Sequence, residues 1–108
     1  MEEQKVIKAL AALAQANRLQ VFRRLVVAGT TGATPGTLGE ALGMPNGTLS
    51  FHLKELMAAD LISQERDGRH LIYRVAFAQM NSVLAYLTEN CCQGAPACLD
   101  ATATACPC

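Results

Sequence analysis

The chain has 108 residues, enough for one domain with its own hydrophobic core, although a partner subunit could supply part of the buried surface. Hydrophobic residues make up 51% of it and its formal net charge is zero, a composition that excludes a wholly disordered chain. No apolar run approaches the length of a membrane span, and the acidic start "MEEQKVIKAL" lacks the basic and continuous apolar regions of a signal peptide, so we expect a cytoplasmic protein without a membrane partner.

The charged residues are unevenly distributed. All nine Lys and Arg lie at or before Arg74, and the 34 residues that follow contain only two acids, Glu89 and Asp100. A surface for an anionic partner must therefore be built from the first three quarters of the chain.

Three helices are predicted in the first part of the chain. Apolar residues recur at helical spacing in two stretches. Over residues 2–14 they are Val6, Ile7, Leu10, Leu13 and Ala14, and over residues 17–29 they are Leu19, Phe22, Leu25 and Val26. The glycine that closes the second stretch tolerates the backbone conformation of a helix end. Thr34 offers a capping hydroxyl and Pro35 suits the first helical position, so a short third helix begins there and ends near Gly43.

Two longer apolar stripes predict two further helices. The stretch "NGTLSFHLKELMAAD" predicts a helix over residues 46–60 whose inward face carries Leu49, Leu53, Leu56 and Met57. A last helix is predicted over residues 77–90, with an inward face of Met80, Val83, Leu84 and Leu87.

A β-hairpin is predicted between these two helices. The runs "LISQER" and "RHLIYRV" flank an Asp-Gly pair at residues 67–68, and such a pair between β-rich runs is typical of a two-residue hairpin loop. With that loop, Arg66 would face Arg69 and Ile62 would face Tyr73 across the hairpin.

A short helix, a turn, a second helix and then an arginine-tipped hairpin is the order of a winged helix-turn-helix, a mainly α fold with a small β-hairpin. The second helix of such a pair enters the DNA major groove, and the wing contacts the backbone or the minor groove. We therefore expect double-stranded DNA as a partner. Base contacts are expected from Asn46, Thr48, Ser50 and Phe51, and phosphate contacts from Lys54, Arg66 and Arg69.

The balance of charge in the predicted DNA-binding region limits this prediction. Residues 45–74 carry four basic and four acidic residues, so the electrostatic attraction to DNA should be modest and should rely on two subunits. The alternative is a helical domain whose hairpin merely covers the core.

The two histidines are predicted to be structural. His52 is expected to be partly buried and hydrogen-bonded within the helix pair, and His70 is expected to be a solvated neighbour of Glu65 across the hairpin.

The segments "ANRLQVFRRL", "LSFHLKEL" and "RDGRHLIYRV" resemble the second-helix, recognition-helix and wing signatures of the ArsR/SmtB family of bacterial metalloregulatory repressors, over about residues 5–90. The resemblance implies a homodimer, paired through the first and last helices, that represses transcription until a metal ion or metalloid releases it from DNA. Two-fold symmetry would make its operator an inverted repeat.

All the cysteines lie beyond the predicted helices. The five, in the last eighteen positions, are Cys91, Cys92, Cys98, Cys106 and Cys108. In the cytoplasm such a cluster favours metal or redox chemistry over structural disulfides. We therefore divide the chain into a DNA-binding and dimerisation domain, residues 1–90, and a cysteine-rich sensing tail, residues 91–108.

Within this family, sensor sites occur at different points on one scaffold. The arsenic site of some members is a Cys-x-Cys pair in the third helix, and here "PGTLGEALG" has no cysteine. The zinc site of others uses Asp and His on the last helix, and "FAQMNSVLAYLTEN" has neither. The vicinal pair after the last helix, with a third cysteine six positions on, resembles the C-terminal site of one arsenite-responsive subgroup.

The chemistry of the tail is consistent with that resemblance. Trivalent arsenic and antimony bind three thiolates, which Cys91, Cys92 and Cys98 can supply as effector ligands. Zinc usually takes four ligands from Cys-x2-Cys units, which the sequence lacks. Cadmium or lead stays an alternative if Cys106 or Cys108 joins, as does a thiol redox switch or a tail without function.

An enzyme is not expected. The vicinal cysteines follow a helix C-terminus, where the helix dipole opposes thiolate formation, and no Ser/His/Asp set, phosphate loop or organic-cofactor motif is apparent. A thiol buffer for metals would be distinguished by whether residues 1–90 bind DNA. The sequence therefore predicts an arsenic-responsive repressor, with redox or cadmium/lead sensing on the same fold as the alternative.

Overall fold

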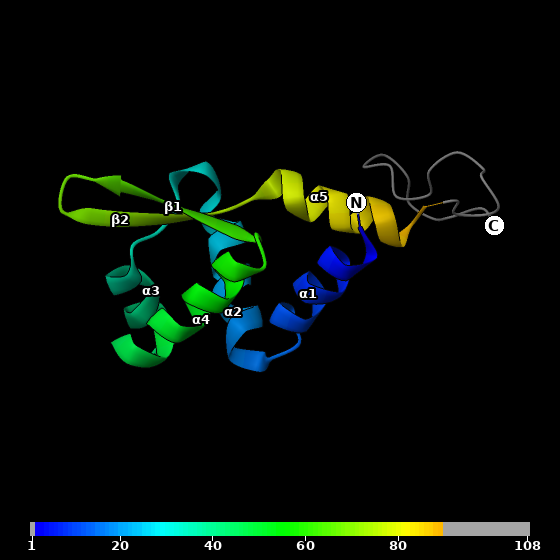
Figure 1. Cartoon of the computed structure of the whole chain (residues 1–108). Helices are drawn as coiled ribbons and strands as arrows, with labels where there is room; N and C mark the ends of the chain where they lie inside the picture. The colour runs from blue at the N-terminus through cyan, green and yellow to red at the C-terminus, as the bar shows by residue number, and fades with distance from the viewer. Residues whose placement is uncertain (1, 90–108) are drawn as a thin grey trace.

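The computed structural model describes residues 2–89 of the chain. Figure 1 shows a β-hairpin projecting from one end of the molecule and the first and last helices lying together toward the other. The elements in chain order are α1 (Glu3–Leu13), α2 (Ala16–Ala28), the 3-10 turn η1 (Gly29–Thr31), α3 (Pro35–Leu42), α4 (Asn46–Ala58), β1 (Ile62–Asp67), β2 (His70–Val75) and α5 (Phe77–Leu87). Within residues 2–89, five helices and a two-stranded antiparallel sheet confirm the predicted mainly α fold with a small hairpin.

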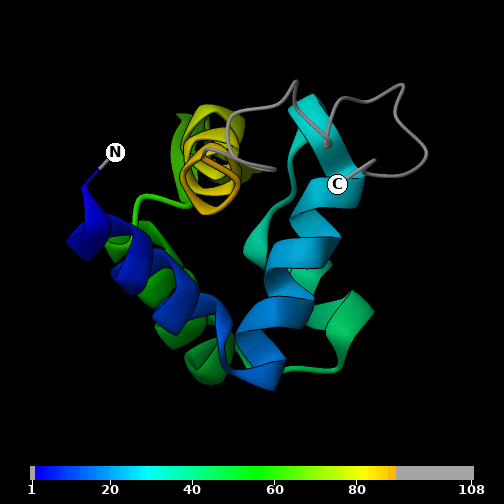
Figure 2. The same ribbon diagram turned by 90° about the vertical axis from the view of Figure 1, so that its right-hand side faces the viewer.

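One apolar core joins the helices to the base of the hairpin. Figure 2, which looks nearly along α5, shows α1 and α2 diverging beneath that helix. The largest fully buried side chains of the core are six leucines and two valines: Leu25, Leu38, Leu49, Leu53, Leu56, Leu61, Val21 and Val83. Burial of such side chains contributes roughly 1.5–3 kcal/mol each before the opposing entropy is counted, so this core holds α4 firmly in place.

The short helix α3 begins and ends where the sequence predicts. The Thr34 hydroxyl accepts a hydrogen bond from the Thr37 backbone N–H at 3.3 Å, and Pro35 occupies the first turn. Gly43 ends the helix in the left-handed conformation, with φ of 62°. These two ends leave only residues 43–45 between α3 and α4.

The register of the hairpin corrects the sequence prediction. The loop consists of residues 68–69, not 67–68, and each expected pair is displaced by two positions. The observed partners include Asp67 with His70, Arg66 with Leu71, Glu65 with Ile72 and Ile62 with Val75. The predicted neighbours Arg66 and Arg69, Ile62 and Tyr73, and His70 and Glu65 are therefore wrong.

Backbone sterics explain the shift of the loop. An Asp-Gly loop of type I′ needs a positive φ at both residues, but in this hairpin the positive φ belongs to Gly68, at 63°. Neither Asp67 nor Arg69 has one. Glycine at the first loop position, followed by a residue with an ordinary φ, is the arrangement of a type II′ turn.

The inward faces of several helices differ from the predicted stripes. Helix α1 buries Val6, Ala9 and Ala12, and its large residues Ile7 and Leu10 stay exposed. The small alanines allow α1 to approach its neighbours closely, which leaves the bulkier side chains outside. Four further residues placed inward by periodicity are also exposed: Leu19 and Val26 on α2, and Leu84 and Leu87 on α5.

The expected sensing tail, with its five cysteines, and the domain boundary at residues 90–91 lie outside the described residues. Within residues 2–89, no helix has the length and apolar character needed to span a bilayer.

Candidate nucleic-acid interface

Helix α4 has one buried and one exposed side. Leu49, Leu53 and Leu56 are buried, together with His52, at the spacing of a single helical face. The residues predicted to contact DNA from this helix are all exposed: Asn46, Thr48, Ser50, Phe51 and Lys54. Their exposure leaves hydroxyl, amide, aromatic and ammonium groups free to meet a partner, as a recognition helix requires.

A glycine in α3 allows α3 to pack tightly against the start of α4. A Cβ atom added at Gly39 would lie 3.1 Å from the carbonyl oxygen of Met44 and 3.7 Å from Leu49 Cδ2. Glycine is therefore the residue that permits this approach without displacing the turn. The position of the turn sets the orientation of the N-terminal end of α4, and with it the direction in which its first exposed side chains point.

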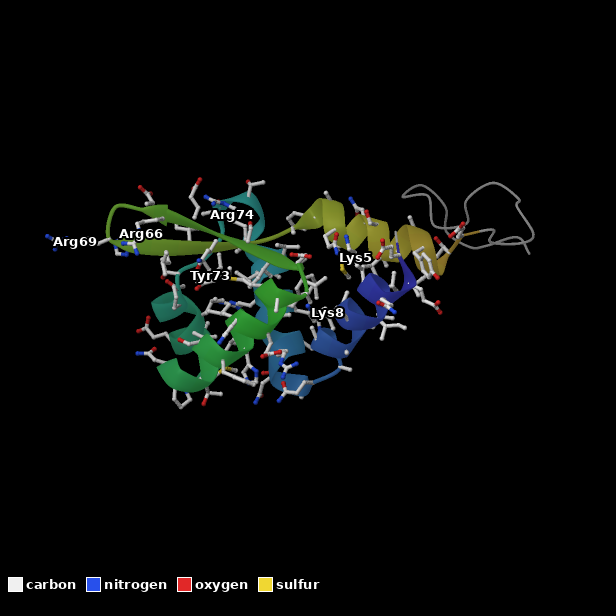
Figure 3. The ribbon with its side chains drawn as sticks, in the orientation of Figure 1. Lys5, Lys8, Arg66, Arg69, Tyr73 and Arg74 are labelled. Carbon is white, nitrogen blue, oxygen red and sulfur yellow. The ribbon has the colours of Figure 1, made fainter. Side chains whose placement is uncertain are left out.

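The wing carries two exposed arginines. Arg66 is the penultimate residue of β1 and Arg69 is in the loop, and Figure 3 shows both at the far end of the hairpin. Lys5 and Lys8, on α1, lie near the opposite end of the molecule. Arg66 and Arg69 are thus separated from the basic residues of α1 and are free to reach a phosphate backbone.

The base of the wing is anchored to the loop between α2 and α3. Ala33 and Tyr73 exchange two backbone hydrogen bonds, of 3.0 Å and 2.8 Å, so the loop runs beside β2 like a third strand. Arg74 Nε donates a hydrogen bond of 2.7 Å to the Thr30 carbonyl oxygen. These interactions fix the hairpin relative to the helix-turn-helix.

Arg74 also forms an ion pair within the wing. Its Nη1 donates to Glu65 Oε1 at 3.1 Å, a diagonal contact between β2 and β1. Both side chains are partly exposed, so the pair adds little stability by itself, but it orients the guanidinium toward Thr30. Sequence reasoning missed this role; the alternation of the strand, which puts Arg74 and Tyr73 on opposite faces (Figure 3), was the available signal.

His52 is the buried polar residue of α4, with 5% of its surface exposed. Its Nδ1 accepts a hydrogen bond of 3.4 Å from Arg18 Nε, on α2. Burial, and secondarily the positive charge of Arg18, lowers the pKa of His52 from the ordinary 6.5. The burial predicted for His52 is confirmed, whereas its hydrogen bond was predicted within the helix pair and is made instead to Arg18 on α2.

Phe51 completes this cluster on the exposed side. The Arg18 Cζ atom lies 5.7 Å from the centroid of the Phe51 ring. The Phe51 and His52 rings meet edge to face, with centroids 5.7 Å apart. A side chain of α2 therefore contacts a residue on the exposed side of the recognition helix.

The structure does not test the cysteine site. Within residues 2–89, no group of three or more His, Cys, Asp or Glu side chains is arranged to hold a metal ion. Cys91, Cys92 and Cys98 lie outside that range, so their role as effector ligands stays a prediction.

Comparison with known proteins supports the helix-turn-helix assignment. A family model described as a helix-turn-helix domain matches residues 13–65, which span α2, α3, α4 and the start of β1. No curated protein sequence matches the chain closely enough to indicate a relative.

Solved structures share the fold over most of both chains. An ArsR-like transcriptional regulator from Rhodococcus sp. RHA1 is similar with a TM-score of 0.70 and 24% identity, over 78% of this chain and 76% of that one. NolR from Sinorhizobium fredii is similar with a TM-score of 0.63 and 27% identity, over 80% and 83%. HlyU from Vibrio cholerae N16961 has a TM-score of 0.66 and 24% identity, over 86% and 100%.

The agreement extends beyond residues 13–65, since each of these three structures covers more than three quarters of the chain. The resemblance to ArsR/SmtB proteins is thereby confirmed at the level of the fold. Residues 13–65 match a helix-turn-helix domain, and the chain has the winged helix-turn-helix fold that ArsR-like regulators of known structure share.

Proposed function

We propose that this chain is a transcriptional repressor that binds operator DNA as a homodimer and releases it when trivalent arsenic or antimony binds the thiolates of Cys91, Cys92 and Cys98. The helix-turn-helix match and the fold support a DNA-binding regulator of the ArsR type. The subunit contact, the operator and the effector are argued below from the residues of this chain.

The observation that carries DNA binding is the division of α4 into two sides. Three leucines anchor the helix in the core, and the opposite side exposes polar residues and one aromatic ring. Thr48 and Ser50 can hydrogen-bond to base edges, and Phe51 can contact a thymine methyl group. The wing arginines supply phosphate contacts that set the position of the helix along the groove.

Exposed apolar residues on two neighbouring helices support the homodimer. Ile7 and Leu10 on α1 and Leu84 and Leu87 on α5 are each at least 40% exposed, and the two helices contact each other. A monomer would leave all four side chains in water, and such clusters typically mark a subunit contact. One solved neighbour, from Mycobacterium bovis, is described as a homodimeric winged helix-turn-helix domain.

Sulfur chemistry supports the metalloid as effector. Three thiolates match the pyramidal coordination of trivalent arsenic and antimony, and soft sulfur ligands select soft acceptors. Cys91 follows the last residue of α5, Leu87, by four positions. A metalloid bound next to a helix of the subunit contact could change the spacing of the two recognition helices, and a coupling of about 1–3 kcal/mol would lower DNA affinity by roughly 5- to 150-fold.

A release titration tests the effector. The full chain is first used to select its preferred duplex from a random pool, and the selected duplex is then labelled for fluorescence anisotropy. We expect arsenite and antimonite to release the duplex, and zinc to have no effect at equal thiol occupancy. Release by cadmium or peroxide but not by arsenite would instead support the alternative sensors.

The same selection tests the assembly. A homodimer should enrich inverted repeats with half-sites about one helical turn apart. Light scattering should show a species of twice the 11.5 kDa chain mass. A single 11.5 kDa species at micromolar concentration, or enrichment of unpaired half-sites, would contradict the dimer.

A further inference from the structure

Arg18 lies between two neighbouring residues of the recognition helix. Its Nε donates a hydrogen bond to His52 Nδ1 at 3.4 Å, and its Cζ lies 5.7 Å from the centre of the Phe51 ring. His52 is buried, whereas Phe51 is 54% exposed. One guanidinium on α2 therefore contacts both the buried and the exposed side of α4.

The hydrogen bond fixes the protonation state of His52. Arginine has only donors, so the Nδ1 atom that receives its N–H must carry a free lone pair, which a neutral imidazole provides. A protonated imidazole donates from both nitrogens and carries a positive charge beside the guanidinium. The attraction then becomes a repulsion between two cations, and Arg18 must move.

We infer that Arg18 is a positioning residue for DNA reading: it holds neutral His52 with its Nε and the Phe51 ring with its guanidinium face, and thereby sets the direction in which Phe51 meets the groove. The inference rests on the proposed use of α4 to read DNA. It adds a pH dependence, because loss of the neutral imidazole removes the hydrogen bond that keeps the guanidinium over Phe51.

The charged surroundings of His52 leave Arg18 as its charged partner in the described residues. On its own helix, Lys54 is exposed and Glu55 lies three positions on. Apart from Arg18, the charged residues on the other elements that pack against α4 are all exposed: Glu3, Lys5 and Lys8 on α1, Arg23 and Arg24 on α2, Glu40 on α3, and Glu65, Arg66 and Asp67 on β1. Burial and Arg18 both disfavour the protonated form of His52, so the neutral form dominates at neutral pH.

The first test is the pH profile of DNA preference at constant ionic strength. We expect wild type to lose preference for the selected duplex over a scrambled one, by about 2- to 5-fold, as His52 becomes protonated, which corresponds to one exposed cation–π contact. His52→Gln keeps an acceptor but does not titrate, so its profile should be flat. His70→Gln removes the exposed histidine of the wing and should keep the wild-type profile.

The second test separates positioning from a direct phosphate contact. Arg18→Lys keeps the charge but removes the planar fork, and Arg18→Met removes both. Both should weaken the preference by about 2- to 5-fold while the salt dependence of binding stays unchanged. In a Phe51→Leu background the Arg18→Met change should have little further effect, because the aromatic ring is already absent.

A third measurement needs no DNA. The His52 ring protons, followed by NMR, should titrate below the ordinary range in wild type, and Arg18→Met should raise that pKa because one of its two lowering influences is removed. Thermal unfolding of each variant identifies any that fail to fold. His52→Gln and Arg18→Lys change the side chain least, so they keep the test valid if Arg18→Met does not fold.

These measurements separate a failure of the proposed DNA binding from a failure of the positioning role of Arg18. If wild type enriches no duplex, the proposed function fails and the inference fails with it. If wild type binds DNA but His52→Gln keeps the pH-dependent loss of preference, the positioning role is wrong. A smaller salt slope in Arg18→Met would overturn it as well, because Arg18 would then be a phosphate contact.

Discussion

Gly32 lies so close to Tyr73 that a Cβ atom added at Gly32 would be 2.6 Å from the Tyr73 carbonyl oxygen. This contact brings the loop between α2 and α3 against strand β2. The same hypothetical atom would also lie 2.8 Å from Arg74 Cγ, beside the residue whose Nε bonds the Thr30 carbonyl oxygen. The wing and the helix-turn-helix are thus joined at a point where only glycine fits, and this close approach helps to set how the wing is oriented relative to the helices.

We expect Gly32→Ala to destabilise the protein and loosen the wing. Gly32 has a φ of 72° and a ψ of −169°, a backbone region almost confined to glycine that costs an L side chain about 1–3 kcal/mol, and the clash with Tyr73 adds to that cost. Gly29→Ala is the control, because its φ of 64° is similar but its Cβ would meet no atom within 4 Å. Urea unfolding should give a larger loss of stability for Gly32→Ala; equal losses would show that the close approach is unimportant.

Replacing Arg66 and Arg69 with alanine should weaken binding to all duplexes alike. Removal of one phosphate interaction should reduce the salt slope of the binding constant by about 0.9. Lys5→Ala with Lys8→Ala removes the same charge from the opposite end of the molecule (Figure 3) and should leave the slope unchanged. Anisotropy titrations at several salt concentrations measure both; equal effects of the two double variants would argue against DNA binding by the wing.

Changes on the outer side of α4 should alter base preference more than affinity for unrelated sequences. Ser50→Ala and Thr48→Val each remove an exposed hydroxyl, so the fold should be unaffected, while discrimination against single base changes should fall by about 1 kcal/mol. Lys54→Ala should instead weaken binding to every sequence. Selection from a random pool checks this, and a Ser50→Ala protein with unchanged preference would contradict the predicted groove contact.

His52 should make stability depend on pH. Its pKa is lowered in the folded chain, so the unfolded chain binds a proton more readily once the pH falls below the ordinary 6.5. The free energy of unfolding should therefore be highest above that pH, decrease as the pH falls below it, and stop decreasing on this account below the folded-state pKa. Urea unfolding from neutral to mildly acidic pH should show this decrease in wild type and a weaker one in His52→Gln, with His70→Gln as the control.

The cysteine variants address the effector. Cys91→Ser, Cys92→Ser and Cys98→Ser should each leave DNA binding intact but abolish release by arsenite, because a three-thiolate site loses one ligand. The double variant Cys106→Ser with Cys108→Ser should respond nearly as wild type does. A double variant that no longer responds would show that the proposed site uses the wrong cysteines.

The sequence alone determined the identity and order of the elements. Thr34, Pro35 and Gly43 mark the ends of α3 through local capping and backbone preferences, and the period of the leucines in α4 places the residues predicted to contact DNA outside. These features depend on residues a few positions apart, so they can be recognised in a linear pattern. The clustering of the five cysteines in the last eighteen positions is also visible in the linear sequence, and its proposed role rests on the chemistry of thiolate ligands.

Only the tertiary structure decided how these elements meet. The Arg18–His52 hydrogen bond joins residues 34 positions apart and the Arg74–Thr30 hydrogen bond joins residues 44 apart, and no periodicity encodes such distances. The hairpin register was misread because Asp67 and Gly68 form a favoured pair locally, whereas the ladder as built needs the positive φ at Gly68 alone. Likewise, Ile7, Leu10, Leu84 and Leu87 obey helical periodicity yet stay exposed, because which face of an amphipathic helix is covered depends on the neighbours that pack against it.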